Sequence, residues 1–420
     1  MYGLVVNLAS LLLAVVLLEV GSGLQGLLIP VRGDIAGFAT MLIGGLGTAY
    51  YLGFVIGCLQ TPRLIHRVGH IRCFAALAAV GACVVLTHGL IVDPWVWIGL
   101  RLVMGYCFAG LYMVVESWLN ELAGSETRGR ILALYMIATW AGVVGGKLLF
   151  PLAPADGFVL FALACMLIAL SLVPVALTAA VAPVLPESSR ASISDVYRTA
   201  PIGLIGCAAV GLANGAFWSL APIFALARGG SSLDVGLFMA AAVVGGALSQ
   251  WPLGRWSDRV DRRWVIFGTC VAAAVVGGLL LVERDGDGIT MLALAAAFGA
   301  SALPIYSLCV AHANDRASPE AFVEVSGRLL LVFGVGAIFG PLVAGVAITW
   351  AGPASLFVYM GVIHIALAAF IVVRLRLVEA VPEAERGSFA PMQPVPHTTQ
   401  VVFELHPASE AAGEAGQKAD

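Results

Sequence analysis

Long hydrophobic runs follow one another along the chain, separated by short segments rich in arginine, aspartate, glycine or proline. Each run is close to the roughly 20 residues that an α-helix needs to cross the hydrocarbon core of a bilayer. Breaking the chain at its polar segments therefore predicts twelve membrane-spanning helices. They are residues 5–30, 40–61, 73–92, 95–120, 130–151, 157–181, 201–227, 233–254, 264–283, 288–312, 327–350 and 354–375.

The composition supports an integral membrane protein. Of the 420 residues, 60% are hydrophobic and 11% are charged, whereas soluble domains carry about 25% charged residues. Nucleic-acid binding finds no support, because the basic residues lie singly in short loops and form no patch. The eight cysteines lie in apolar segments without C-x-x-C spacing. We expect buried, inert thiols, with no metal and no cofactor.

Basic residues of the predicted loops gather on one side of the membrane. The loops after the even-numbered helices and the end of the last helix, counted with the helix ends that border them, hold fifteen arginines. The opposite side holds three, namely Arg32, Arg228 and Arg284. Cytoplasmic loops carry the excess of arginine and lysine. We therefore expect a multi-pass protein of the plasma (inner) membrane with both termini in the cytoplasm.

The stretch LLEVGSGLQGLL, residues 17–28, contains Gly21, Gly23 and Gly26 in the spacing G-x-G-x-x-G. A dinucleotide-binding loop needs a strand before these glycines and a helix after them, within a βαβ unit. Here they lie inside a predicted membrane helix, where small residues let neighbouring backbones approach closely. A P-loop is missing as well, because the glycines before Lys147 have the wrong spacing. We expect neither ATP-driven pumping nor an enzyme.

The second half of the chain repeats features of the first half in the same order. The loop GRWSDRVDRR, residues 254–263, aligns with PRLIHRVGHI, residues 62–71. ESWLNE at the end of the fourth predicted helix aligns with VAHAND at the end of the tenth. A carboxamide precedes glycine in the first and seventh helices, at Gln25 and Asn214. An ordered set of matches at half length indicates an internal repeat.

These segments resemble the major facilitator superfamily of transporters. GRWSDRVDRR resembles the superfamily's loop signature G-x-x-x-D-R-x-x-R-R, with His66 in place of the aspartate in the first-half copy. GAIFGP, residues 336–341, and RLVMG, residues 101–105, resemble two of its helix motifs. ESWLNE, HAND and EVSGRLLLVFGVGAIFGP further resemble the YcaD-like branch.

The resemblance implies an all-α integral membrane fold of twelve helices in two pseudo-symmetric six-helix bundles. The bundles would rock about a site near the bilayer midplane, lined by the first, fourth, seventh and tenth helices. We assign residues 1–181 to the N-terminal bundle, 182–200 to a cytoplasmic linker and 201–377 to the C-terminal bundle. Residues 378–420 are rich in acids and prolines and are expected to be a disordered cytoplasmic tail, apart from a short apolar element that could dock, QVVFELHP at residues 400–407.

Glu19 lies about halfway along the first predicted helix. An ionisable group at mid-bilayer is expensive, so such residues usually face a cavity and mark an ion or substrate path. Glu19 is our candidate for proton coupling. The alternative is a protonated carboxyl group that bonds to a neighbouring helix and takes no part in transport.

Gln25, Asn214 and Trp218 are candidates for binding a solute. The two amides occupy matching places in the two halves and offer both donors and acceptors, although amides also pack helices together. Trp218 could stack on a ring or simply pack.

Arg101, Tyr106 and Tyr112 on the fourth helix could line the same cavity. Arg101 could bind an anion, pair with Glu19 or extend to the membrane surface. The tyrosines could instead be packing residues. Lys147 lies near the outer end of the fifth helix, where extension to the surface is the default expectation.

A cytoplasmic latch is the third predicted site. Its charges would form state-dependent ion pairs, with Glu116 bonded to Arg67 or Arg130. The assigned residues are Arg67, Glu116, Glu121, Arg130, Asp258, Arg259, Arg262 and Arg263. The alternative for the charges of residues 254–263 is an anchor that only follows the positive-inside rule.

The sequence therefore favours a secondary transporter of a small polar or anionic organic solute, working by alternating access in the lipid bilayer and coupled to protons through Glu19. It would act as a monomer. The alternatives are an uncoupled uniporter of the same fold and a receptor or assembly partner that transports nothing.

Overall fold

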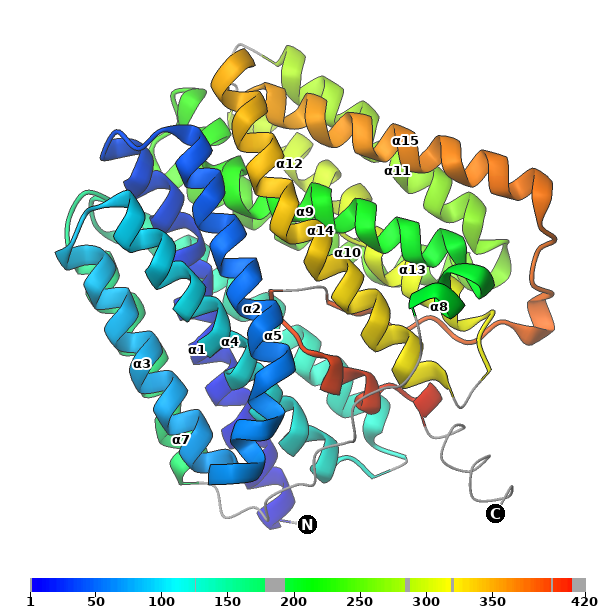
Figure 1. The fold of residues 1–420 in the computed structure, drawn as a ribbon, viewed down its shortest axis with the longest axis horizontal. Helices are drawn as coiled ribbons and strands as arrows, with labels where there is room; N and C mark the ends of the chain where they lie inside the picture. Colours follow the sequence, from blue (N-terminus) through cyan, green and yellow to red (C-terminus); the bar gives the residue numbers. More distant parts are fainter. Residues whose placement is uncertain are drawn as a thin grey trace.

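The computed structural model describes residues 2–124, 126–177, 193–283, 288–318, 321–393 and 396–409. In these ranges every regular element is a helix, and twelve helical stretches are long and apolar enough to cross a membrane. The predicted all-α fold and its twelve spans are confirmed. The protein is thus a multi-pass membrane protein (Figure 1).

The first bundle holds the helices of the N-terminal half. α1 packs against α5 and α6, and α4 packs against α2 and α3. The elements are α1 (Tyr2–Ile35), α2 (Thr40–Val68), α3 (His70–Leu90), α4 (Pro94–Leu122), α5 (Arg128–Leu149), η1 (Phe150–Leu152), α6 (Val159–Leu170) and α7 (Leu172–Ala176).

The second bundle holds the helices of the C-terminal half. α9 packs against α14 and α15, α10 against α12, and α11 against α15. The elements are α9 (Pro201–Ala227), α10 (Ser232–Arg259), α11 (Arg262–Val282), α12 (Gly288–Ala302), α13 (Ile305–Asn314), α14 (Phe322–Ala351) and α15 (Ser355–Leu377). Most of the predicted linker, residues 182–192, lies outside the described residues, and α8 (Ile193–Thr199) precedes α9.

Local chemistry sets several helix ends. The Asp93 carboxylate accepts bonds from the amides of Trp95 and Val96 at the start of α4, and Ser231 with Asp234 forms a capping box at the start of α10. Such caps satisfy amides that have no partner inside the helix. The tenth predicted span differs from expectation: it is two helices, α12 and α13, separated at Leu303 and Pro304, because proline cannot donate the helical bond.

The glycines of residues 17–28 lie inside α1, as predicted from the hydrophobic pattern. A methyl group added at Gly23 would lie 2.5 Å from the Val143 carbonyl oxygen of α5. From the opposite side, a methyl group at Gly142 of α5 would lie 2.5 Å from Cβ of Glu19. The glycines therefore let α1 and α5 pack backbone to backbone, which fixes Glu19 against α5.

The two bundles touch each other at the end of the molecule opposite the chain termini (Figure 1). The Thr48 hydroxyl of α2 donates to the Ile338 carbonyl of α14 at 2.7 Å. Nearby, a methyl group on Gly345 would lie 3.2 Å from the Thr40 carbonyl oxygen, so α2 and α14 are in close contact. α5 also packs against α10. At the end that carries the termini, the bundles are instead separated by the C-terminal segment.

The C-terminal segment does not match the expected disordered tail. Residues 378–393, with η3 (Glu383–Glu385), run along the second bundle at the end that carries the termini, and residues 396–409, with η4 (Gln400–Leu405), lie between the bundles (Figure 1). Acidic and proline-rich composition predicts disorder only when too little apolar surface can be buried. Here Val401, Val402, Phe403 and Leu405 are almost fully buried. Residues 410–420 lie outside the described part of the chain.

Candidate functional site

A cavity lies between the bundles, beside Pro396 and His397 of the C-terminal segment. Its volume is about 60 Å³, which is room for about two water molecules. α1, α2, α4, α5 and α9 supply most of its wall. Pro396 and His397 of the C-terminal segment form the wall on the side of the termini. In this state the cavity holds only a small solute.

Two cationic side chains line the cavity. The Arg101 guanidinium lies 4.2 Å from the centre of the Tyr50 ring, and the Lys147 ammonium lies 5.3 Å from the centre of the Trp218 ring. Neither cation forms an ion pair among the described residues. The expected extension of Lys147 to the membrane surface is wrong, because only 3% of the residue is exposed. Packing of α5 against α1 and α10 turns it inward.

Gln25 and Trp218, two of the predicted solute-binding residues, also line the cavity. Within the described structure, Gln25 Nε2 and the Trp218 indole nitrogen are buried and have no hydrogen-bond partner. Buried donors without partners are uncommon in folded proteins. Both groups are available to a bound solute.

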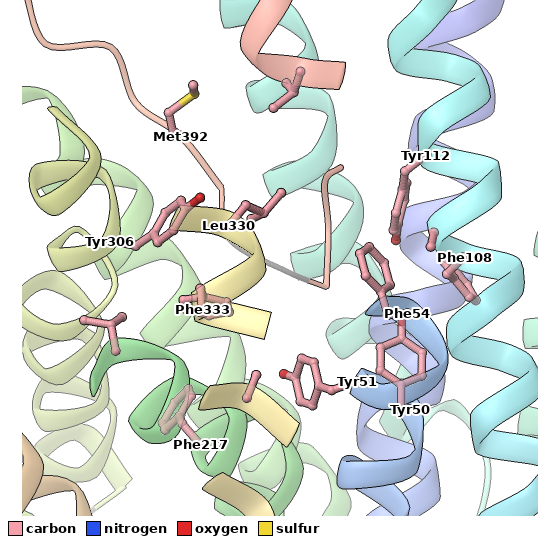
Figure 2. Close-up of a cluster of buried hydrophobic side chains, with 14 of the residues drawn as sticks. Tyr50, Tyr51, Phe54, Phe108, Tyr112, Phe217, Tyr306, Leu330, Phe333 and Met392 are labelled. Atoms are coloured by element: carbon pink, nitrogen blue, oxygen red, sulfur yellow. The ribbon is translucent and has the colours of Figure 1, made fainter. Parts of the chain in front are cut away.

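The structure separates the other predicted binding residues from the cavity. Asn214 is buried in α9 but is not part of the cavity wall. Tyr106 lies beside Thr61 and Cys73, on the α2 and α3 side of α4. Tyr112 packs against Phe54 and Phe108 (Figure 2), and its hydroxyl lies beside Glu19 and Ser22.

Glu19 is fully buried in α1. Its Oε2 lies 3.1 Å from Nδ1 of His397. Arg101, the partner considered from the sequence, lies over Tyr50 instead. His397 was not among the sequence candidates, because it belongs to the segment expected to be disordered. The apolar element QVVFELHP that follows it was the signal that this segment can dock.

Glu116 does not form the predicted ion pair with Arg67 or Arg130, which are both exposed. Its carboxylate is fully buried and accepts a bond from the Tyr135 hydroxyl at 2.9 Å. It also accepts bonds from the Thr398 hydroxyl at 2.5 Å, from the Thr399 amide at 3.1 Å and from the Thr399 hydroxyl. Glu116 is therefore the main anchor of the C-terminal segment on the first bundle.

Part of the predicted latch forms a network on the second bundle. The Arg262 guanidinium bonds to Asp258 at 2.9 Å and to Asp315 at 2.6 Å. Arg263 pairs with Asp261 at 2.7 Å. The network holds the C-terminal segment as well, because the Phe389 amide donates to Asp258 and Arg262 donates to the Gly387 carbonyl. Glu121 and Arg259 are exposed.

Apolar and polar contacts continue along the segment. Met392 lies near Tyr306 and Leu330 (Figure 2), and its amide and carbonyl both bond to the Ser307 hydroxyl. Asn120 donates to Glu404, and Arg128 bonds to Ser409 at 3.0 Å. Burial raises the pKa of Glu404 to about 7, although Arg128 opposes the shift. Burial lowers the pKa of His406 to about 4.

No metal site can be identified in the described ranges, because no three His, Cys, Asp or Glu side chains lie together there. Two cations, a free amide and aromatic faces surround a cavity, beside a buried carboxylate.

Comparison with solved structures shows the fold. The nucleoside transporter NupG superposes with a TM-score of 0.75 and 12% identity, covering 88% of this chain and 98% of NupG. An inward-facing, occupied bacterial homologue of the human lysosomal transporter Spinster gives a TM-score of 0.70 and 14% identity, covering 91% and 98%. The fucose:proton symporter FucP of E. coli gives 0.55 and 15% identity, covering 88% and 99%.

Comparison with sequences shows the family. The sequence model of the Major Facilitator Superfamily matches residues 203–408. The uncharacterized MFS-type transporter YcaD of Salmonella arizonae is 30% identical over 337 residues, which cover 79% of this chain and 86% of the relative. YcaD of Escherichia fergusonii is 28% identical over 304 residues, covering 72% and 78%. The chain belongs to the major facilitator superfamily, as a YcaD-like MFS-type transporter.

Proposed function

We propose that the protein is a secondary active transporter that moves a small organic solute by alternating access and couples the movement to protons through Glu19. The observation that carries the proposal is a fully buried carboxyl group in α1, one turn from the cavity residues Ser22 and Gly23. Ionisable residues at this depth in a membrane protein are costly and usually belong to an ion or substrate path.

The surroundings of Glu19 suit a group that gains and loses a proton. The Tyr112 hydroxyl and the Lys147 ammonium lie near it, and His397 bonds to it. A protonated Glu19 would leave the charge of Lys147 uncompensated, whereas an ionised Glu19 offsets it. Protonation of Glu19 would therefore change the electrostatic potential at the cavity, which is what coupling requires.

The arrangement of the bundles supports alternating access. α2 and α14 close one end of the path, and the C-terminal segment fills the other. The Spinster homologue, with a similar fold, is described as inward-facing and occupied. Among the structural neighbours, NupG is named a nucleoside transporter and FucP a fucose:proton symporter. Rocking of two rigid bundles about a central site is the general means by which such folds expose it to each side.

The test is proton-driven accumulation in liposomes. A thermal-stability screen of the purified protein identifies a solute, since a ligand that binds only the native state raises the melting temperature. With an inward proton gradient, we expect uphill uptake of that solute by the wild type and by the exposed-site control Glu126→Gln. Glu19→Gln should retain solute exchange but lose the response to the gradient.

Uptake by Glu19→Gln that still follows the proton gradient would exclude this residue as the coupling group. Equilibration of the solute without any gradient response in the wild type would indicate a uniporter. No flux of any solute that binds would instead favour a receptor.

A further inference from the structure

We propose that the central cavity is a binding site for organic anions, in which Arg101 and Lys147 hold a carboxylate or a similar acidic group. The inference deepens the proposed transport function by naming its substrate class. It concerns binding, and is therefore tested separately from flux.

The charge of the cavity wall favours an anionic ligand. The residues that line the cavity include two permanent or readily charged cations, Arg101 and Lys147, and no aspartate or glutamate. The nearest carboxyl group, Glu19, is bonded to His397. An ionised Glu19 offsets the charge of Lys147 only, and Arg101 has no carboxylate beside it among the described residues. An uncompensated cation in a low-dielectric interior is expensive, and an anionic ligand would offset that cost.

The cationic heads are held in place by aromatic rings. Arg101 lies on Tyr50, and Lys147 lies on Trp218. Cation–π contacts of this kind orient a cation without neutralising it. The planar guanidinium of Arg101 matches a carboxylate in a two-point bond. The Gln25 amide, which has no partner among the described residues, can donate a third bond to the ligand.

The volume of the cavity limits the size of the compounds that can test the proposal. At about 60 Å³ it admits compact acids in the present state. Acetate and propionate can be compared with their neutral amides and with propylammonium, all at equal ionic strength. The acids should raise the melting temperature of the wild-type protein, and the best acid should bind about ten-fold more tightly than its amide.

Variants assign the effect to the two cations. The preference for acid over amide should fall at least by half in Lys147→Gln and in Arg101→Gln, and should persist in Lys147→Arg. Equal binding of an acid and its amide, stronger binding of an ammonium compound, or no binding of any acid would overturn the proposal. Anion binding without flux would leave it standing while removing the transport function. Flux of a neutral solute without binding of any acid would overturn the anion site and leave the transport function standing.

The docked C-terminal segment, residues 387–393 and 396–405, supports a second proposal independently. We infer that this segment is a self-inhibitory plug, which closes the path between the bundles on the side of the chain termini. The inference rests on the proposed transport function for its biological meaning, but the blocked path can be tested without a substrate.

The segment bonds to both bundles at once. On the first bundle it is held by Glu19, Glu116 and Asn120. On the second bundle it is held by Ser307 and by Asp258 with Arg262. Alternating access requires the ends of the bundles on this side to approach each other. A bonded segment between them prevents that approach.

The segment also occupies groups that transport would use. His397 bonds to the proposed coupling carboxyl of Glu19 and stands in the cavity wall beside Pro396. The segment therefore covers part of the cavity on this side and holds the coupling group at the same time. Its release would open the path and free Glu19 in one step.

Docking is tested by hydrogen exchange of the backbone amides. The Thr399 amide bonds to Glu116, and those of Val402 and His406 bond within η4. We expect these amides to exchange slowly in the wild type and at least ten-fold faster in Thr398→Ala/Thr399→Ala. The control Thr349→Ala removes a threonine that is exposed on α14 and should leave the exchange unchanged.

Blocking is tested by access to the cavity. Ser22 lies in the cavity wall, so Ser22→Cys reports whether a membrane-impermeant maleimide reaches it from the cytoplasmic face of inside-out vesicles. Labelling above the background of the parent should be slow with the intact segment and at least ten-fold faster when Thr398 and Thr399 are both alanine. Rapid exchange of the segment in the wild type, or unchanged labelling after its release, would overturn the plug.

Discussion

Gly23 and Gly26 lie three residues apart on α1, yet they meet different surroundings. A methyl group at Gly23 would lie 2.5 Å from a backbone oxygen of α5, whereas one at Gly26 would meet nothing within 4 Å. The backbone of α5 cannot move aside for an added methyl group as readily as the end of a flexible side chain can. At the residue scale, a single added methyl group at Gly23 therefore suffices to disturb the contact between α1 and α5.

We predict that Gly23→Ala destabilises the protein by about 1–3 kcal/mol, the usual cost of overpacking. Gly26→Ala is the matched control and should change stability by less than about 0.5 kcal/mol. Thermal unfolding of the purified protein in detergent measures both. Equal losses of stability would show that the close packing of α1 on α5 is not the cause.

Arg262 and its two carboxylate partners illustrate burial at the same scale. The side chains of Arg262 and Asp315 are 1% and 4% exposed, whereas Asp258 is 33% exposed. Removal of one partner from a buried ion pair leaves the other charge without compensation. An exposed partner is solvated when its pair is broken, so its loss matters less.

Asp315→Asn should therefore cost about 1–3 kcal/mol of stability, because Asp258 still pairs with Arg262, and Asp258→Asn should cost clearly less. The melting temperatures of the two variants provide the comparison. A greater loss for Asp258→Asn would contradict the assignment of Asp315 as the main partner of Arg262.

At the element scale, η4 combines an acid and a base that respond to pH in opposite directions. Burial raises the pKa of Glu404 from its ordinary 4.5 to about 7, so the docked segment prefers the neutral acid. This contribution to docking is present below pH 4.5 and is lost as the pH rises to about 7. Burial lowers the pKa of His406 from 6.5 to about 4. Its contribution is present above pH 6.5 and is lost as the pH falls to about 4.

The two contributions nearly cancel in the wild type, and single variants should separate them. Relative to wild type, docking of Glu404→Gln should weaken as the pH falls from 6.5 to 4.5, and docking of His406→Gln should weaken as the pH rises over the same range. Hydrogen exchange of the η4 amides, corrected for the intrinsic effect of pH, measures both. The same direction in both variants would contradict the assignment.

At the scale of the whole molecule, the two bundles are in contact at one end and held apart at the other. Alternating access should reverse this arrangement once the C-terminal segment is released. Spin labels can report the change at Ala36 and Ala351 on the closed end, and at Arg130 and Arg259 on the other. All four residues are exposed.

In Thr398→Ala/Thr399→Ala, the Ala36–Ala351 distance should gain a longer population and the Arg130–Arg259 distance a shorter one. A pair within one bundle, Arg67 and Arg130, should not change. The measurement requires Cys83, which is exposed, to be replaced by serine. Changes of the same sign at both ends, or none at either end, would contradict rocking of the bundles.

Much of the fold could be predicted from the sequence because membrane burial leaves a strong local signal. Uninterrupted hydrophobic runs gave the twelve spans, and loop motifs gave the family. The residues of the site were harder to predict from the sequence. Gln25, Arg101 and Trp218 do line one cavity, but Lys147 joins them and Asn214 and Tyr106 do not. The surroundings of a side chain on a helix depend on how the helices pack against one another. The local sequence does not determine that packing.

The C-terminal segment shows most clearly the difference between what the sequence and what the tertiary structure determine. By itself, the sequence determined that the chain crosses the membrane twelve times and carries a carboxyl group deep in α1, because hydrophobicity acts locally and in proportion to apolar area. Only the tertiary structure decided that His397 meets Glu19 and that Thr398 and Thr399 meet Glu116. These partners are about 280 to 380 residues apart in the chain. A segment with few apolar residues docks only because two folded bundles present buried carboxylates and an apolar groove to it, so its order is a property of the assembled molecule.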